Sequence, residues 1–194
     1  MTTHCPTIVN RLINSQKDSY LELGIDNGLN FNAIFSLDKY SVDFRPQCGP
    51  NFAGTSDAFF AQNTKRFDYI FIDANHDYDF VVNDFINSLL IADKMIILHD
   101  MNPPTKMHSE SGHCSDSYKL LTLLKKETEC DIFTLAHDFG LSFVPIPNRD
   151  FTITPELVEK YRSLSYEDFC EYRDDNIKLY DTEEMIQTLK NYQV

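Results

Sequence analysis

Basic residues are scarce in this sequence. Its 194 residues contain 17 Lys and Arg against 30 Asp and Glu, which gives a formal net charge of −13 at pH 7. Proteins that bind nucleic acid or anionic membranes neutralise phosphate groups with clustered Lys and Arg. The composition therefore argues against nucleic acid or an anionic membrane as the main partner. A small neutral or cationic partner suits this charge better.

Long apolar runs and a cysteine framework are also missing. No stretch approaches the roughly 20 apolar residues of a membrane-spanning helix, and the N-terminus has no hydrophobic signal-peptide region. The five cysteines are odd in number and lack Cys-x-x-Cys spacing, which argues against a disulfide framework or a zinc site: Cys5, Cys48, Cys114, Cys130 and Cys170. We expect a cytoplasmic protein with reduced thiols and no membrane insertion.

Strand-like and helix-like segments alternate along the chain. The predicted strands are Tyr20–Leu23, Lys39–Phe44, Asn51–Thr55, Phe67–Asp73 and Met95–His99, with a closing antiparallel pair at Asp131–Leu135 and Leu141–Val144. The predicted helices are Thr7–Asn14, Leu29–Leu37, Asp57–Gln62 with Ser56 as its cap, Phe80–Ala92 and Ser117–Glu127. This alternation predicts an α/β fold with a mostly parallel sheet covered on both faces, whose ligands bind beyond the carboxyl ends of the strands.

The composition changes after Pro147, where charged helical segments follow. We expect three helices there, one starting at Thr154 and the others spanning Tyr166–Asn176 and Thr182–Tyr192. The sequence therefore predicts a ligand-binding domain over residues 1–147 and a helical C-terminal extension over residues 148–194. The extension would pack against the sheet or against a second subunit, as in a homodimer.

The stretch from Ser19 to Asn32 predicts a strand, a glycine turn and a helix. Gly24 ends the apolar strand, and Gly28 precedes the helix. Such a junction presents free backbone N–H groups and the positive end of a helix dipole to a ligand. Glu22 lies inside the strand, where an acid is rarely found unless it meets a hydrogen-bond donor. The alternative is a surface-facing Glu on an edge strand.

Polar residues follow consecutive strands at the point where each strand ends. Asp43 comes 21 residues after Glu22, which is the separation of a ribose-binding acid in nucleotide-binding sheets. The ends of the next strands carry Ser56 with Asp57, then Asp73, then His99 with Asp100. Any one of them alone is explained equally well by a helix cap or a solvated loop acid. Together they predict a polar site at one edge of the sheet.

Several segments resemble, in order, the motifs of class I S-adenosylmethionine-dependent methyltransferases. They are Tyr-Leu-Glu-Leu-Gly-Ile-Asp-Asn-Gly, Ser-Val-Asp-Phe-Arg-Pro, Gly-Thr-Ser-Asp-Ala-Phe-Phe, Phe-Asp-Tyr-Ile-Phe-Ile-Asp-Ala-Asn-His and Ile-Ile-Leu-His-Asp-Met-Asn-Pro-Pro. The chain is similar in particular to small bacterial and viral members with Ile-Asp-x-x-His and Leu-His-Asp after two strands. The similarity spans Leu12 to Pro147 and includes Asp-Phe-Gly at positions 138–140.

The resemblance implies a Rossmann-like sandwich with an antiparallel last strand and a cofactor site at the strand ends. Glu22 would contact the methionine end of S-adenosylmethionine, Asn30 its carboxylate, and Asp43 its ribose hydroxyls. Gly24 and Gly28 would let the backbone pass close to the cofactor, Ser56 and Asp57 would border the adenine, and Asp73 would lie near the transferred methyl. Asp26 departs from the pattern, because a small residue is usual in that turn.

The implied chemistry is O-methylation of a small hydroxylated or sugar-containing acceptor. The acceptor must approach the sulfonium in line while a base removes its proton or a metal acidifies it. His76, His99 and Asp100 are the catalytic candidates, although each histidine could instead be a structural imidazole. The polar loop Met101–Asp116 is expected to form a lid on the acceptor side.

A divalent metal such as Mg²⁺ or Mn²⁺ is the alternative to a base, since Asp73 and Asp100 end adjacent strands. Related metal-dependent enzymes have an amide or acid directly after the second aspartate, where this chain has Met101. The sequence therefore favours a base over a metal. Two other functions stay open: a non-catalytic protein that binds the nucleotide without transfer, and a nicotinamide-dependent oxidoreductase.

Overall fold

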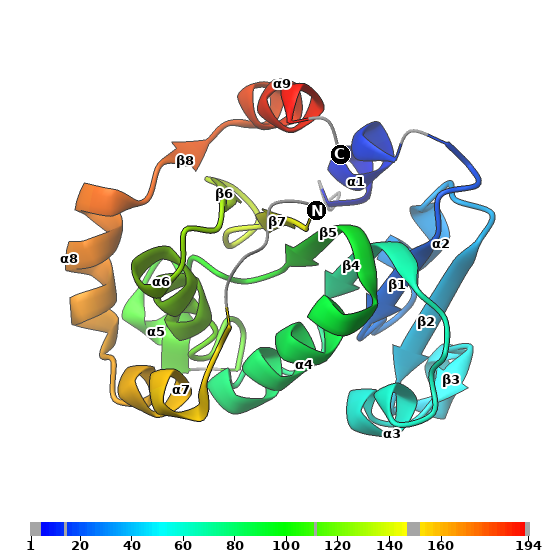
Figure 1. Ribbon diagram of the computed structural model, residues 1–194, viewed down its shortest axis with the longest axis horizontal. Helices are drawn as coiled ribbons and strands as arrows, with labels where there is room; N and C mark the ends of the chain where they lie inside the picture. The colour runs from blue at the N-terminus through cyan, green and yellow to red at the C-terminus, as the bar shows by residue number, and fades with distance from the viewer. Residues whose placement is uncertain (1–4, 14, 111, 147–151, 193–194) are drawn as a thin grey trace.

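A single sheet organises the fold in the computed structural model, which describes residues 5–13, 15–110, 112–146 and 152–192. Its eight strands lie in the order β3-β2-β1-β4-β5-β7-β6-β8 (Figure 1). The strands are β1 (Tyr20–Leu23), β2 (Lys39–Asp43), β3 (Phe52–Ala53), β4 (Phe67–Ile72), β5 (Ala92–Leu98), β6 (Phe133–Leu135), β7 (Ser142–Pro145) and β8 (Leu179–Tyr180).

Strand direction confirms the predicted α/β class. The strands from β3 to β5 are parallel to one another, β7 runs antiparallel to both β5 and β6, and β8 lies parallel to β6. The order 3-2-1-4-5 is that of a Rossmann-like, doubly wound sheet, in which the direction of winding reverses between β1 and β4. A crevice forms at such a reversal, outside the carboxyl ends of the two strands.

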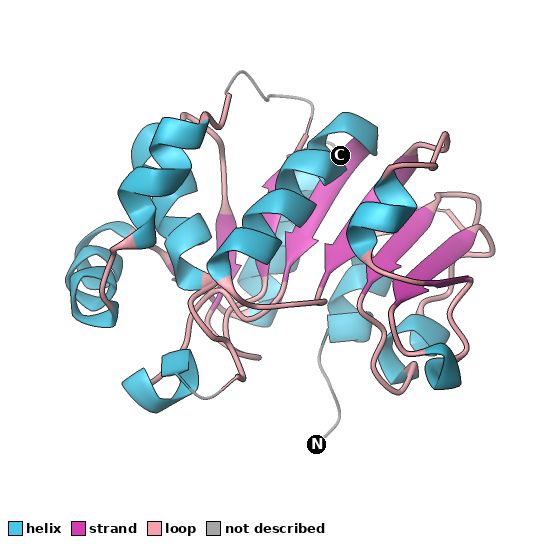
Figure 2. Cartoon of the chain, turned by 90° about the horizontal axis from the view of Figure 1, so that it is seen from below, coloured by secondary structure: helices cyan, strands magenta, loops and turns pink. Residues whose placement is uncertain are grey.

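Helices cover both faces of the sheet (Figure 2). Alternate side chains of a strand point to opposite faces, so Leu21 and Leu23 belong to one core and Tyr20 to the other. The first core is closed by α4 (Tyr78–Ile91) and α6 (Tyr118–Glu127), and the second by α1 (Cys5–Leu12) and α9 (Thr182–Asn191). The remaining helices are α2 (Leu29–Ala33), α3 (Ser56–Phe60), α5 (Lys106–Glu110), α7 (Pro155–Arg162) and α8 (Tyr166–Asn176).

Several predicted helix ends are shifted in the structure, and two of the shifts have a clear cause in local hydrogen bonds. Helix α2 stops at Ala33 instead of Leu37, because Ile34 is extended and the Lys39 ammonium binds the carbonyls of Phe31 and Ile34 at 2.8 and 2.9 Å. Helix α3 is capped by Thr55 and not by Ser56, since Thr55 Oγ1 accepts the Ala58 N–H at 3.2 Å. Both differences depend on local hydrogen bonds. At the start of α3, for example, Thr55 and Ser56 carry the same capping group, so the sequence does not decide between them.

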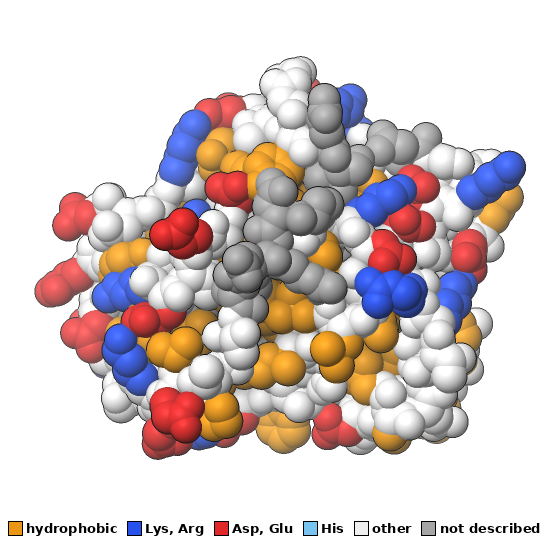
Figure 3. Space-filling model, viewed as in Figure 1, with side chains coloured by type: hydrophobic (Ala, Val, Ile, Leu, Met, Phe, Trp, Pro, Cys, Tyr) orange, Lys and Arg blue, Asp and Glu red, His pale blue; other side chains and the backbone are white. Residues whose placement is uncertain are grey.

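The C-terminal segment packs along the sheet and its helices. Helices α7 and α8 contact α6, β8 extends the sheet beside β6, and α9 lies against α1. The predicted boundary at residues 147 and 148, like the predicted helix end at Asn14, lies outside the described residues. Within the described part of the chain, no helix is long and apolar enough to cross a membrane. On the face shown in Figure 3, Lys and Arg side chains are scattered among acidic ones and form no continuous basic surface.

Candidate active site

A cavity of about 190 Å³ lies at the carboxyl ends of β1, β2 and β4. Its lining includes five of the predicted cofactor residues: Gly24, Asp43, Ser56, Asp57 and Asp73. The sequence did not indicate three of the other lining side chains, Arg45, Phe80 and Asp84. The cavity is therefore placed where the winding of the sheet reverses, as the strand pattern predicted.

Gly24 lets the β1–α2 turn touch the end of β4. Its φ is +83°, and a Cβ at this position would lie 2.2 Å from the carbonyl oxygen of Asp73 and 2.5 Å from Cα of Ala74. Only glycine combines this left-handed backbone with so close an approach. In the structure Gly24 therefore sets the floor of the cavity by contacting protein backbone.

Asp43 already holds several hydrogen-bond donors. Its carboxylate accepts the backbone N–H groups of Ile25, Asp26 and Arg45 at 3.0, 3.2 and 2.8 Å, and the Arg45 guanidinium at 3.2 and 3.3 Å. Burial would raise the pKa of Asp43, but the Arg45 and backbone hydrogen bonds outweigh it and lower the pKa below its usual value. Asp26 completes the network, since it pairs with Arg45 at 2.9 Å.

Glu22 lies in a central strand and accepts hydrogen bonds there, as predicted for a buried acid. Its carboxylate accepts the Tyr20 hydroxyl at 2.6 Å and the Asn30 amide at 2.9 Å, and the residue is 1% exposed. Burial raises the pKa of Glu22 to about 7, although both hydrogen bonds act in the opposite direction. Glu22, Gly28 and Asn30 are not among the residues that line the cavity. Their contact with a cofactor stays a prediction.

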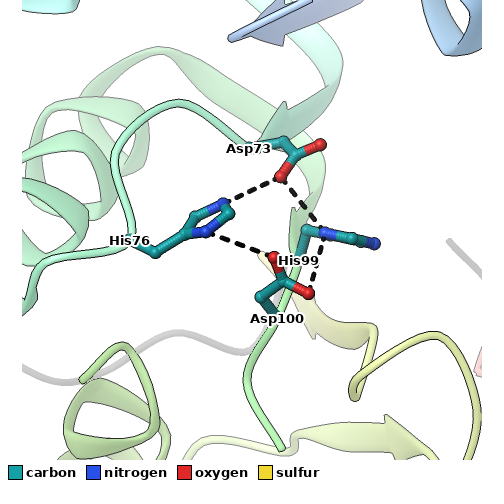
Figure 4. Close-up of side chains that lie close together, drawn as sticks. All are labelled: Asp73, His76, His99 and Asp100. Carbon is teal, nitrogen blue, oxygen red and sulfur yellow. Dashed lines mark hydrogen bonds and ion pairs between the residues drawn. The ribbon is translucent and has the colours of Figure 1, made fainter. Parts of the chain in front are cut away.

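Four predicted side chains come together beside the cavity (Figure 4). Asp73 Oδ1 lies 3.0 Å from Nε2 of His76 and 3.1 Å from Nδ1 of His99. Asp100 lies 3.2 Å from Nδ1 of His76 and 3.3 Å from Nδ1 of His99. Because Asp73 also lines the cavity, it connects this cluster to the predicted cofactor site.

The carboxylates make both histidines strong bases. Burial would lower the pKa of His99, but Asp73, Asp100 and Asp138 together raise it well above its usual value. The pKa of His76 is also raised, since Asp73 and Asp100 outweigh its burial. Burial would raise the pKa of Asp73, but the two histidines outweigh this effect and lower the pKa to about 2. The carboxylates thus favour the protonated form of both imidazoles.

Two buried atoms in the cluster lack a hydrogen bond of good geometry within the described residues: Nδ1 of His99 and Oδ1 of Asp100. They are within ion-pair distance of each other, yet neither is satisfied. Asp100 also has a φ of +60°, a strained value for a residue with a side chain. Its backbone is fixed by the Ser117 hydroxyl, which donates to its carbonyl at 2.6 Å. Unpaired polar atoms and strain together are typical of a functional site.

The cluster also has the donors of a metal site. Each of its four residues offers one ligand atom, and these atoms lie within 4.8 Å of one another. Two imidazole nitrogens and two carboxylate oxygens suit a first-row transition ion such as Mn²⁺, whereas Mg²⁺ prefers oxygen ligands alone. The four residues therefore fit a divalent cation, even though Met101 stands where related metal-dependent enzymes have an amide or acid.

Residues outside the predicted catalytic and cofactor set complete the surroundings. Asp138 lies 3.9 Å from Nε2 of His99 and accepts the Cys5 thiol at 2.7 Å. From the predicted lid, the carbonyl of His113 binds Nδ1 of His76, and Asp116 accepts the Tyr78 N–H at 2.6 Å. His113 thus joins this segment to the cluster, and the role of the segment as a lid stays a prediction.

Comparisons with known proteins find similar folds. No protein-family model and no curated protein matches the chain. The cofactor-bound Rv0187 protein from MTB is 12% identical with a TM-score of 0.59, covering 77% of this chain and 82% of that one. The O-methyltransferase from Bacillus cereus in complex with SAH is 14% identical with a TM-score of 0.51, covering 75% and 80%. TomG, an O-methyltransferase from Streptomyces achromogenes in complex with SAM, is 13% identical with a TM-score of 0.50, covering 75% and 80%.

Proposed function

We propose that this chain is an S-adenosylmethionine-dependent methyltransferase that methylates an oxygen of a small hydroxylated or sugar-containing acceptor. The observation that carries the proposal is the position of Asp73. This carboxylate lines the cavity at the reversal of the sheet and also contacts His76 and His99. A cofactor in the cavity would therefore present its methyl group to the cluster. The solved folds with SAH and SAM support the choice of cofactor.

In this arrangement the cofactor extends from α3 to the end of β4. Ser56 and Asp57 border the adenine, Asp43 lies beside the ribose, and Asp73 attracts the positively charged sulfonium. Asn30 donates its amide N–H to Glu22 and offers a buried amide oxygen without a partner among the described residues, so we assign it the amino group of the methionine part in place of the carboxylate that the resemblance implies. Glu22 then acts by holding the amide of Asn30.

The acceptor hydroxyl docks against the two unsatisfied atoms, Oδ1 of Asp100 and Nδ1 of His99. Its oxygen attacks the methyl carbon while the carbon–sulfur bond breaks, and that electron pair stays on sulfur to give S-adenosylhomocysteine. The hydroxyl proton passes to a neutral histidine of the cluster. His99 or His76 must lose one proton to solvent before it can act as this base.

A divalent cation bound by the same four side chains would lower the pKa of the acceptor hydroxyl. Asp73 and Asp100 would supply oxygen ligands, while His76 and His99 would supply nitrogen ligands. The side chains would then orient the acceptor, and a solvent molecule or Asp138 would receive the proton.

Calorimetry with the purified chain tests the proposal. We expect binding of S-adenosylhomocysteine and no comparable binding of NAD. Mass spectrometry of hydroxylated acceptors incubated with S-adenosylmethionine should show a gain of one methyl group. Absence of S-adenosylhomocysteine binding would refute the proposal, and tight binding without transfer to any acceptor would assign a non-catalytic binding protein instead.

A further inference from the structure

Asp84 is a buried acid on α4 that faces the cavity. It is 2% exposed and lies among the apolar residues Val81, Val82 and Phe85 of the same helix. It nevertheless belongs to the lining of the cavity. An acid in apolar surroundings is costly unless it meets a partner. No Lys or Arg forms an ion pair with it in the described ranges, so the cost is not offset by a positive charge.

Asp84 lies on the helix that packs against α3, and it lines the cavity together with Ser56 and Asp57 of that helix. Helix α4 starts shortly after Asp73, and Asp84 comes six residues after its first residue, about 9 Å along the helix axis. At this depth α4 packs against α3, and Ser56 of α3 lines the same cavity as Asp84. The adjacent Asn83 donates to Asp57 at 2.6 Å. These contacts place Asp84 beside the two residues expected to border the adenine.

The chemistry of the carboxyl limits what can lie against it. Burial raises the pKa of Asp84 to about 6, and the nearby Ser56 acts in the opposite direction. A buried carboxylate accepts hydrogen bonds and repels carbonyl oxygens. The six-membered ring of adenine carries an amino group at its edge, whereas that of hypoxanthine carries a carbonyl at the same position.

We propose that Asp84 accepts a hydrogen bond from the exocyclic amino group of the cofactor's adenine and selects adenosyl over inosyl ligands. This inference rests on the proposed function. It assigns base selectivity to a helix residue whose sequence neighbours gave no sign of it. The competing explanation is structural, in which Asp84 only fixes α3 against α4 through Ser56.

Calorimetry with two ligands separates these explanations. The wild-type chain should bind S-adenosylhomocysteine at least about tenfold more tightly than S-inosylhomocysteine, since one hydrogen bond to a buried charge is lost and a repulsion is gained. Asp84→Asn keeps the shape but offers an N–H to the inosyl carbonyl, so the preference should fall to within about threefold. Ser88→Ala is the control, because Ser88 is fully buried one turn further along α4 and does not line the cavity.

The outcomes are distinct. Equal binding of both ligands by the wild-type chain would overturn the inference, and this measurement does not depend on any variant. An Asp84→Asn chain that binds both ligands more weakly but keeps the wild-type ratio would establish the structural explanation. If the wild-type chain binds neither ligand, the proposed function itself fails.

Discussion

Replacing Asp43 by alanine should reduce both the stability of the chain and its affinity for S-adenosylhomocysteine. The carboxylate holds three backbone N–H groups, of which that of Ile25 is buried. A buried donor left without an acceptor costs about 1–3 kcal/mol, and the two others lose charge-assisted bonds of about 1 kcal/mol each once water replaces them. We therefore expect the free energy of unfolding to fall by about 3–5 kcal/mol. The ribose hydroxyls would lose their acceptor too, which should weaken binding about 10–100-fold.

Arg45→Ala is the matched comparison. Its guanidinium occupies the same carboxylate at 3.2 and 3.3 Å, but the Arg45 side chain is 36% exposed. Asp43 itself is buried but keeps its three backbone N–H donors in this variant, so the loss of stability should be smaller than in Asp43→Ala. Removing the guanidinium also frees acceptor positions on Asp43. Ligand affinity should therefore stay within a few-fold of wild type or increase.

Urea unfolding with and without ligand measures both quantities at once. The free energy of unfolding without ligand measures how much the Asp43 hydrogen bonds stabilise the chain. The increase in this free energy at a fixed ligand concentration gives the dissociation constant of the ligand. Unchanged ligand stabilisation in Asp43→Ala would refute the role of Asp43 in binding ribose. Equal loss of binding in Arg45→Ala would show that the guanidinium, and not the carboxylate, contacts the ligand.

Four other predictions follow from the site. His99→Ala and His76→Ala should leave S-adenosylhomocysteine affinity within a few-fold, and the variant that lacks the base should lose at least about 100-fold in kcat; normal kcat in both would mean that no histidine base is needed. Because the pKa values of both histidines are raised, the neutral base forms, and kcat increases, only above the usual histidine value of about pH 6.5. Asp100→Asn should move this increase to lower pH. A kcat that does not change with pH would contradict the prediction. The same shift means that the charged histidines stabilise the fold most below about pH 6.5 and lose that contribution as pH rises through their raised pKa, which denaturation at several pH values can measure. Chelation with EDTA should leave turnover within about twofold, since a histidine base can remove the acceptor proton without a metal, and a complete loss restored by Mn²⁺ would give the role to a metal.

The sequence by itself determined the class of fold. A short apolar run rich in aromatic and β-branched residues, such as Phe67–Asp73, is typical of a buried strand. Helices between such strands favour parallel neighbours, so the polar residues after each strand were expected to share one edge. The same reasoning indicated that Glu22 meets a donor if its strand is central, and it left open an exposed Glu on an edge strand. The central position of β1 decided between the two. Short local choices were less certain, as the exchange of Ser56 for Thr55 at the start of α3 shows.

Only the tertiary structure decided which groups at that edge touch. Asp73 and His99 are brought together by the register of β4 with β5, and Asp100 is turned toward them by a left-handed backbone that a strand pattern does not indicate. Asp84 was out of reach of sequence reasoning for a related reason. A helix residue faces a cavity or the core according to the rotation of its helix against the sheet. That rotation depends on the packing of many side chains that lie far apart in the chain, so a local sequence pattern does not predict it.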